Sequence, residues 1–134
     1  MKNINIEYNA MTNLQQIIET AFDNRSKINT STKGEAREAV TETLNQLDSG
    51  ELRICEKVDN SWKVNDWAKK AILLSFRLND NFVSTTGDDK YSNYFDKVPL
   101  KFANWNESDF RNAGFRAVQD VLLGIVHLLV KTWF

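Results

Sequence analysis

The 134-residue chain holds 42% hydrophobic and 26% charged residues, the proportions of one soluble globular domain with a modest core. Its 17 basic and 18 acidic side chains give a net charge of −1, which argues against a protein that binds nucleic acid by neutralising phosphates. The chain has one cysteine, so no disulfide can form within it, and the opening residues MKNINIEYNA lack the pattern of a secretion signal. These features predict a cytoplasmic protein.

The first helix is predicted within LQQIIETAFDNR, directly after Thr12, whose hydroxyl suits the N-cap position. Apolar residues recur there at helical spacing, so one face of the helix is expected to be buried. That face consists of Leu14, Ile17, Ile18, Ala21 and Phe22. We interpret residues 1–11 as a polar N-terminal extension, either disordered or lying before a second plausible start at Met11.

A second helix and a hairpin are predicted next. STKGEAREAVTETLNQLDSG has helical periodicity and ends at Gly50, a residue type common at helix C-termini. Its expected inward positions are Ala36, Ala39, Val40, Leu44 and Leu47. ELRICEKVDNSWKV then predicts two strands joined by a turn at Asp59 and Asn60, and Leu52 and Ile54 alternate in part with more polar residues.

The strongest helical pattern is NDWAKKAILLSFRLNDN, residues 65–81, with Asn65 as the expected N-cap. One apolar stripe consists of Trp67, Ala71, Leu74 and Leu78, and Ala68, Ile72 and Phe76 widen it. An apolar arc this wide predicts a helix that packs on more than one side.

The remaining segments are less regular. STTGDDKYSN, residues 84–93, is polar and contains a glycine, which predicts a loop. FDKVPLKFANW carries the single proline, Pro99, and predicts an extended edge segment. Its expected anchors are Phe95, Val98, Leu100 and Phe102.

NESDFRNAG predicts one or two turns of a capped helix. The predicted elements together indicate a small α+β domain over residues 12–118.

The sequence shows no self-contained active site. It has no nucleophile elbow, no glycine-rich phosphate loop and no His/Cys cluster with metal-ligand spacing, so we predict no catalytic, cofactor-binding or metal-binding residue. The residues that could suggest chemistry each have a simpler interpretation. His127 is incidental, Cys55 is a small core or boundary residue, Asp88-Asp89 and Glu107/Asp109 are solvated charges, and Trp62, Trp67, Trp105 and Trp133 are core or boundary residues.

Basic residues give the sharper candidates. Lys97 and Lys101 flank a short apolar run, and Arg116 lies in GFRAV among small and apolar neighbours. An arginine in an apolar setting needs an anion, because burying an unpaired charge is unfavourable. Spacing alone favours a structural salt bridge to Asp or Glu, and the other interpretation is a bidentate contact with the carboxylate of a ligand.

Several long stretches together resemble one family. They are LQQIIETAF, REAVTETLNQLDSGELRICEK, WKVNDWAKKAILLSFRLNDN, YFDKVPLKF and GFRAV. From about Met11 to Val118 they are similar, in order and in register, to the N-terminal domain of tetrahydrodipicolinate N-succinyltransferases.

The resemblance implies succinyl transfer from succinyl-CoA to the amine of a ring-opened dicarboxylic substrate, in the diaminopimelate route to lysine. It also implies a homotrimer, with this small α/β domain followed by a left-handed β-helix of hexapeptide repeats whose neighbouring copies bind CoA between them. The arginine of the family's G-F-R motif holds a substrate carboxylate, and here that residue is Arg116. The resemblance therefore reverses the preference for a structural salt bridge. No membrane or nucleic-acid partner is implied.

The final stretch, QDVLLGIVHLLVKTWF, residues 119–134, departs from the family. Ten residues lie between Asp120 and Lys131, whereas a membrane-spanning helix needs about 20 apolar residues. If the codons of residues 119–134 are read one base out of step, they permit the sequence P-G-C-T-V-R-H-S-A-F-I-S-K-N-V-V-L. This sequence resembles the segment with which the family enters its β-helix. We hypothesise that one base was lost between the codons of Val118 and Gln119, which the downstream gene sequence would test.

Without the β-helix, the CoA cleft and trimer core are expected to be absent, so the chain is predicted to bind no cofactor and to be inactive alone. A competing interpretation is a non-enzymatic α/β binding module whose apolar tail docks on a partner or on a second copy. Leu122, Ile125, Val126 and Leu129 fall on one face of such a tail if it is helical.

Overall fold

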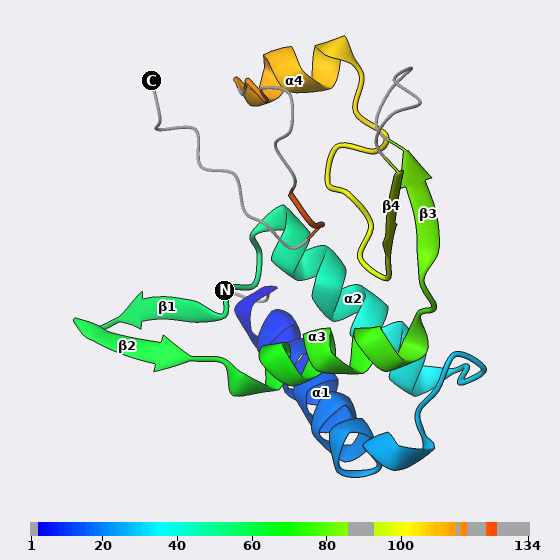
Figure 1. Cartoon of the computed structure of the whole chain (residues 1–134). Coiled ribbons are helices and arrows are strands. Elements are labelled where there is room, and N and C mark those ends of the chain that lie inside the picture. Colours follow the sequence, from blue (N-terminus) through cyan, green and yellow to red (C-terminus); the bar gives the residue numbers. More distant parts are fainter. Residues whose placement is uncertain (1–2, 86–92, 115, 118–122, 126–134) are drawn as a thin grey trace. The chain divides into compact units, whose positions relative to one another are not determined.

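A computed structural model describes residues 3–85, 93–114, 116–117 and 123–125, with the backbone alone for residues 3–12, 85 and 93 (Figure 1). The chain divides into two compact units, residues 1–80 and residues 81–134. Helices and short antiparallel sheets make up the described part, which confirms the α+β class. Among the described residues, no helix combines the length and apolar character that a membrane crossing needs.

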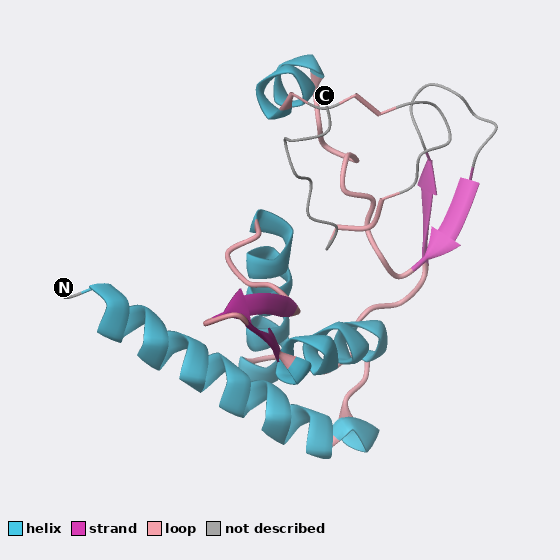
Figure 2. Cartoon of the chain, turned by 90° about the vertical axis from the view of Figure 1, so that its left-hand side faces the viewer, coloured by secondary structure: helices cyan, strands magenta, loops and turns pink. Residues whose placement is uncertain are grey.

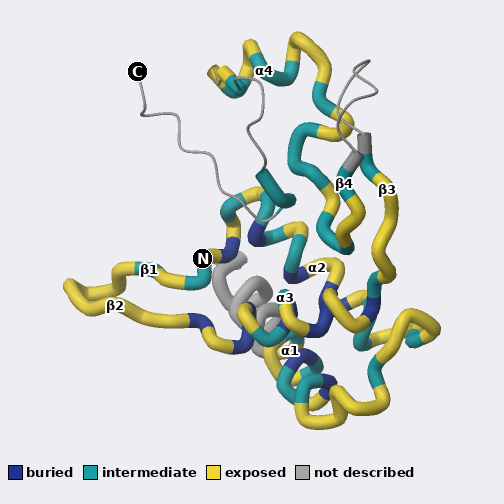
Figure 3. The backbone as a smooth tube through the Cα atoms, in the orientation of Figure 1, coloured by how far each residue is buried: buried dark blue, intermediate teal, exposed yellow. Residues whose placement is uncertain are grey.

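Three helices form the first unit: α1 (Asn3–Asp23), α2 (Glu35–Ser49) and α3 (Asp66–Leu78), with a 3₁₀ turn η1 (Arg25–Lys27) after α1. Each helix packs against the other two, and Figure 3 shows the buried positions on their facing sides. The apolar core comprises Ile18, Ala21, Ala39, Val40, Leu47, Leu52, Trp67, Ala68, Ala71, Leu74 and Leu78. At about 25 cal/mol per Å² of apolar area, this burial is the main stabilising term of the unit.

Helix α1 begins at Asn3, ten residues before the start that an N-cap at Thr12 predicts. Thr12 lies inside the helix, so its assignment as the N-cap was wrong. The segment before Thr12 contains neither glycine nor proline, and each residue added to an existing helix gains a further hydrogen bond. Residues 3–11, interpreted as a polar extension, are therefore helical in backbone.

Helix α2 ends as its sequence predicts. Gly50 has φ of 83°, in the left-handed region that favours glycine, and its N–H donates to the Gln46 carbonyl at 3.1 Å. Thr43 is fully buried although it is polar, because its hydroxyl donates to the Ala39 carbonyl at 2.7 Å. The predicted inward residues Ala36 and Leu44 are half-buried instead.

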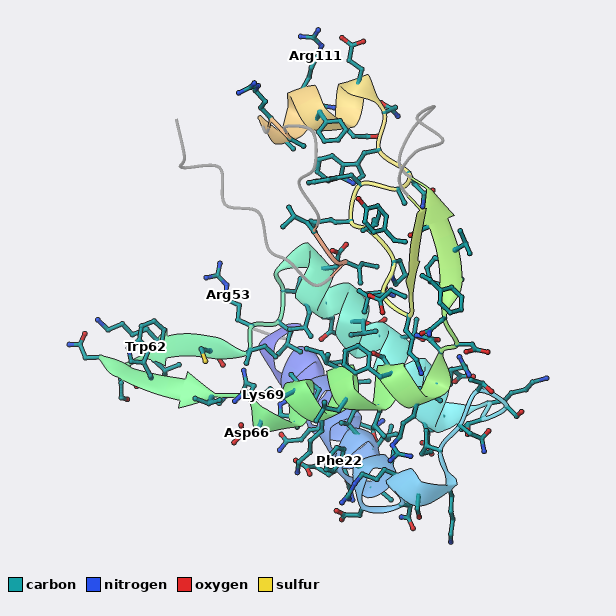
Figure 4. All side chains as sticks on the ribbon, viewed as in Figure 1. Phe22, Arg53, Trp62, Asp66, Lys69 and Arg111 are labelled. Atoms are coloured by element: carbon teal, nitrogen blue, oxygen red, sulfur yellow. The ribbon has the colours of Figure 1, made fainter. Side chains whose placement is uncertain are left out.

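Helix α3 packs against both α1 and α2, which confirms the inference from its wide apolar arc. Phe76 lies outside that arc, with 39% of its surface exposed. The side chain of Asn65 does not cap the helix as predicted, because its amide is directed to the preceding hairpin. At the first turn, Asp66 forms an exposed ion pair with Lys69 at 3.1 Å (Figure 4).

Arg37 of α2 joins three segments of the first unit. Its Nε donates to the Thr32 carbonyl at 2.6 Å, and its Nη2 donates to the carbonyls of Thr30 and Leu78 at 2.8 Å each. Leu78 is the last residue of α3, where main-chain carbonyls lack partners within the helix. One guanidinium thus ties the loop before α2 to the end of α3.

A hairpin of β1 (Cys55–Val58) and β2 (Ser61–Val64) connects α2 to α3. The turn residues Asp59 and Asn60 have φ of 47° and 63°, as a two-residue hairpin turn requires, so the predicted turn is confirmed. The hairpin extends away from the helices in Figure 1 and toward the viewer in Figure 2. Cys55 is therefore exposed and Trp62 is 72% exposed, so their assignment to the core or its boundary was wrong.

The second unit contains a hairpin that the sequence analysis missed, β3 (Phe82–Thr85) and β4 (Asn93–Asp96), so the two ends of the predicted loop are strands. Val83 pairs with Phe95 on an exposed face, and Phe95, at 69% exposure, is not the predicted anchor. Val98, Leu100 and Phe102 are half-buried. The predicted short helix is α4 (Glu107–Ala113), confirmed with a full capping box between Asn106 and Asp109.

Candidate functional site

Arg116 lies just beyond the C-terminus of α4, and the way this helix ends determines its position. Gly114 has φ of 62° and donates its N–H to the Arg111 carbonyl at 3.1 Å, which turns the chain out of the helix. Two residues later Arg116 is exposed, and Ala117 beside it is half-buried. The predicted site residue therefore lies on an irregular segment immediately after a capped helix.

The surroundings of Arg116 differ from the premise of a buried arginine. Its exposure removes the argument that burial of the charge demands an anion. In the part of the chain that the structure describes, no carboxylate forms an ion pair with it. Arg111 behaves differently, because its Nε and Nη2 both contact Glu107 Oε1, at 2.9 and 2.5 Å, on the outer side of α4 (Figure 4).

The segment that carries Arg116 is closed at its base by main-chain hydrogen bonds. Leu100 and Gly124 form an antiparallel bridge, in which the Lys101 N–H donates to the Leu123 carbonyl at 2.8 Å and the Ile125 N–H donates to the Pro99 carbonyl at 3.1 Å. Residues 123–125 are half-buried. The chain thus returns to the Pro99 segment seven residues after Arg116.

Three aromatic rings lie within that closed segment. Phe102 and Trp105 have ring centroids 4.8 Å apart, Phe102 and Phe110 are 5.2 Å apart, and Trp105 and Phe110 are 5.0 Å apart. Tilted and edge-to-face pairs at this separation are stabilising. They attach α4 to the segment before it, which restrains the helix from which Arg116 follows.

The other polar cluster lies at the base of the first hairpin. Asn65 Nδ2 donates to the Arg53 carbonyl at 2.8 Å and to Glu56 Oε1 at 3.1 Å, and Lys63 Nζ lies 3.4 Å from the same carboxylate oxygen. The Asn65 hydrogen bond is the main cause that lowers the pKa of Glu56 below its ordinary value; burial opposes it in part, and Lys63 lowers the pKa further. These groups satisfy one another, so the cluster secures the hairpin.

The other candidate residues from the sequence analysis either have structural roles or lie outside the described residues. Lys97 and Lys101 are half-buried, and the Lys97 N–H donates to Asp96 Oδ1 at 2.7 Å. Asp109 completes the capping box and Glu107 pairs with Arg111, as expected for charges at a helix start. Trp67 is in the core and Trp105 is half-buried. Asp88, Asp89, His127 and Trp133 lie outside the described residues, and within the described ranges no His, Cys, Asp and Glu group could hold a metal ion.

Sequence reasoning missed the bridge at the base of the Arg116 segment. The proline in VPLK indicated an extended strand, but only the three-dimensional structure pairs this strand with residues 123–125. Main-chain pairing between segments 24 residues apart leaves no residue-type signal in a single sequence.

Comparison with known proteins gives consistent matches. Residues 13–78 match the family described as tetrahydrodipicolinate N-succinyltransferase N-terminal. A 2,3,4,5-tetrahydropyridine-2,6-dicarboxylate N-succinyltransferase of Agrobacterium fabrum is 57% identical over 114 residues, covering 84% of this chain and 40% of the relative. Enzymes of the same name from Parvibaculum lavamentivorans and Neisseria meningitidis serogroup B are 51% identical over 114 residues and 60% identical over 107 residues.

These relatives are longer proteins. The matches cover 85% of this chain and 41% of the Parvibaculum relative, and 78% of this chain and 38% of the Neisseria relative. The chain thus spans about 40% of the length of the curated relatives it matches.

Proposed function

Because residues 13–78 of this chain belong to the tetrahydrodipicolinate N-succinyltransferase N-terminal family, we propose that the chain serves succinyl transfer from succinyl-CoA to tetrahydrodipicolinate. The observation that carries the proposal is the 57% identity over 114 residues to a relative that is named for this activity. Such identity over most of a domain is far more specific than a short motif. Succinyl-CoA enters as a co-substrate, and the domain itself contributes substrate binding.

In this proposal Arg116 binds one carboxylate of the dicarboxylic substrate. Its exposed guanidinium can present two parallel N–H donors to a carboxylate, which fixes both the position and the orientation of the bound group. Addition of water to the C=N bond of tetrahydrodipicolinate opens the ring and frees the substrate amine. The amine nitrogen then forms an amide bond with the succinyl carbonyl carbon while the thioester C–S bond breaks, and the proton that the nitrogen loses goes to the departing sulfur, so CoA leaves as the thiol. Holding the amine against the thioester supplies much of the acceleration, because it replaces a collision in solution by a local step.

A chimera tests this role. Residues 12–118 of this chain are joined to the remaining sequence of the Agrobacterium relative, and succinyl transfer is followed by release of the CoA thiol. We expect turnover, and we expect Arg116→Gln to raise KM for the dicarboxylate by about 10- to 100-fold, the loss of a charge-assisted bidentate contact.

Arg111→Gln is the matched control, since Arg111 is an exposed arginine five residues upstream whose described ion pair is with Glu107. Arg116→Lys keeps the charge but not the planar fork, so its KM should fall between those of Arg116→Gln and the parent chimera. Equal effects of Arg116→Gln and Arg111→Gln would remove Arg116 from the substrate site.

We further propose that the 134-residue chain has no succinyltransferase activity by itself. The support is that the chain spans about 40% of the length of its relatives. An active site that also uses residues from the rest of such a protein is incomplete in a chain of this span. Turnover by the purified chain with both substrates contradicts this proposal. Assembly as a homotrimer in the cytoplasm is likewise an extension from the family, and cross-linking of the active chimera tests the trimer.

The single-base shift between the codons of Val118 and Gln119 remains our proposal for residues 119–134. Sequencing the gene beyond the codon of Phe134 tests it, and downstream DNA without hexapeptide repeats in the other frame rules it out. The alternative of a docking tail relies on Leu122, Ile125, Val126 and Leu129. Ile125 is half-buried and its N–H donates to the Pro99 carbonyl at 3.1 Å, the other three lie outside the described residues, and no described contact favours docking.

A further inference from the structure

We infer that the bridge between residues 99–101 and 123–125 is a positioning element for Arg116, and that it works through main-chain atoms alone. Its two hydrogen bonds, Lys101 N–H to Leu123 O and Ile125 N–H to Pro99 O, lie on either side of the facing pair Leu100 and Gly124. This is the widely spaced ring of an antiparallel ladder, in which the facing residues exchange no hydrogen bond with each other.

The bridge gives Arg116 a second anchor. On its N-terminal side, the capping box, the three aromatic rings and the turn at Gly114 hold α4 in place. On its C-terminal side, the next described attachment of the chain is Leu123. A guanidinium tethered on both sides samples a smaller volume than one tethered on a single side, so less entropy is lost when a carboxylate binds.

The bridge depends little on residue type. Both donors and both acceptors are main-chain groups, so position 125 can hold any residue that has a main-chain N–H. Proline is the exception, because it lacks that donor. Residues 123–125 belong to the stretch that departs from the family in sequence and still complete the bridge, and the out-of-step decoding given above also places a non-proline residue at position 125.

Limited trypsin digestion of the whole 134-residue chain tests the inference. Arg116 is exposed, and cleavage after it requires the local chain to open. We expect Ile125→Pro to speed cleavage after Arg116 about fivefold, the effect of losing one main-chain hydrogen bond on the opening equilibrium. Ile125→Val keeps the N–H and the branched side chain, so it should leave the rate unchanged.

Cleavage after Arg53 is the internal control, because Arg53 is an exposed arginine of the other unit (Figure 4). The inference is overturned if Ile125→Pro leaves the rate at Arg116 unchanged, if Ile125→Val accelerates it equally, or if cleavage after Arg53 rises by the same factor.

A second readout separates positioning from simple loop stability, and it rests on the proposed function. Pyridine-2,6-dicarboxylate is titrated as a stable dicarboxylate probe, and its protection of the Arg116 bond is measured. We expect Ile125→Pro to need a several-fold higher concentration for half-protection than Ile125→Val. Equal concentrations overturn the positioning role, and so does an absence of protection in the wild type. The substrate role of Arg116 is tested separately by the chimera, which contains the rest of the relative's length.

Discussion

Replacing Arg37 by glutamine is expected to destabilise the first unit far more than a typical surface substitution. The wild-type guanidinium donates to three carbonyls, those of Thr30, Thr32 and Leu78, at 2.6 to 2.8 Å. The Thr30 contact is exposed, so water replaces it with little loss. The contacts with Thr32 and Leu78 are partly buried, and each loses a charge-assisted hydrogen bond.

The two partly buried bonds set the size of the effect. Hydrogen bonds to charged groups contribute about 1.5–3 kcal/mol each, and partial exposure places both bonds at the low end of this range, so we expect a total loss of about 3 kcal/mol. Arg37→Lys should recover only part of the lost stability, because a single ammonium group cannot reproduce the planar guanidinium that donates to both the loop before α2 and the end of α3.

Urea unfolding followed by the helical signal in circular dichroism measures the change. Arg25→Gln is the matched control: Arg25 donates locally to the Phe22 carbonyl at 3.0 Å and its guanidinium lies 4.7 Å from the centroid of the Phe22 ring, both in an exposed setting, so its loss should be about 1 kcal/mol or less. If Arg37→Gln loses no more than Arg25→Gln, the three-segment contact does not stabilise the unit.

Three further predictions concern the first unit. Leu74 is 1% exposed and lies on α3 facing the core, so Leu74→Ala should lose about 2–5 kcal/mol in urea unfolding, whereas Leu73→Ala, at a 52% exposed position, should lose less than about 1 kcal/mol. Asn60 has φ of 63°, so Asn60→Val should weaken the hairpin by about 1–2 kcal/mol while Asn60→Gly is neutral or stabilising, and chemical shifts of the hairpin strands should distinguish the two. The folded pKa of Glu56 is lowered, so its stabilising contribution is present above its unfolded pKa and is lost as the pH falls through the lower folded pKa. Thermal unfolding between pH 6 and pH 3 should therefore be less pH-dependent in Glu56→Gln than in the wild type, and identical pH profiles contradict the assignment.

The features that the sequence predicted well depend on local chemistry. Gly50 ends α2 because it adopts a backbone conformation that other residues rarely adopt, and Asp59 and Asn60 form the hairpin turn for a similar reason. The α4 cap follows from Asn106 and Asp109, which are three residues apart and satisfy each other's main-chain donors. Such signals lie within a few residues, so a single sequence contains them.

The features that it missed depend on partners distant in the chain. Alternation near Cys55 indicated a strand, but whether a face of that strand is covered depends on the rest of the fold, and the hairpin leaves Cys55 and Trp62 exposed. Strand β3 begins four residues after the last residue of α3, and it pairs with β4 across residues that the sequence predicted as a loop. Thr43 was not among the predicted inward positions of α2, and it is buried because its hydroxyl donates to the preceding helical turn, a bond that residue type does not reveal.

Arg116 illustrates the same limit at the candidate site. Spacing alone favoured a salt bridge, and it was the resemblance over a whole domain that assigned the residue to a substrate carboxylate. The structure adds the two constraints on its segment, the turn at Gly114 and the bridge to Pro99, which residue types did not indicate.

The exposed hairpin has a practical consequence for spectroscopy. Trp62 is 72% exposed and Trp67, five residues later, is 5% exposed, so two indoles close in sequence report on opposite environments. A collisional quencher such as acrylamide should extinguish the red-shifted emission of Trp62 first and reach Trp67 only when the helices separate. With Trp62, Trp105 and Trp133 each replaced by phenylalanine, the emission maximum of Trp67 becomes an intrinsic optical probe of the packing between α3 and its neighbouring helices.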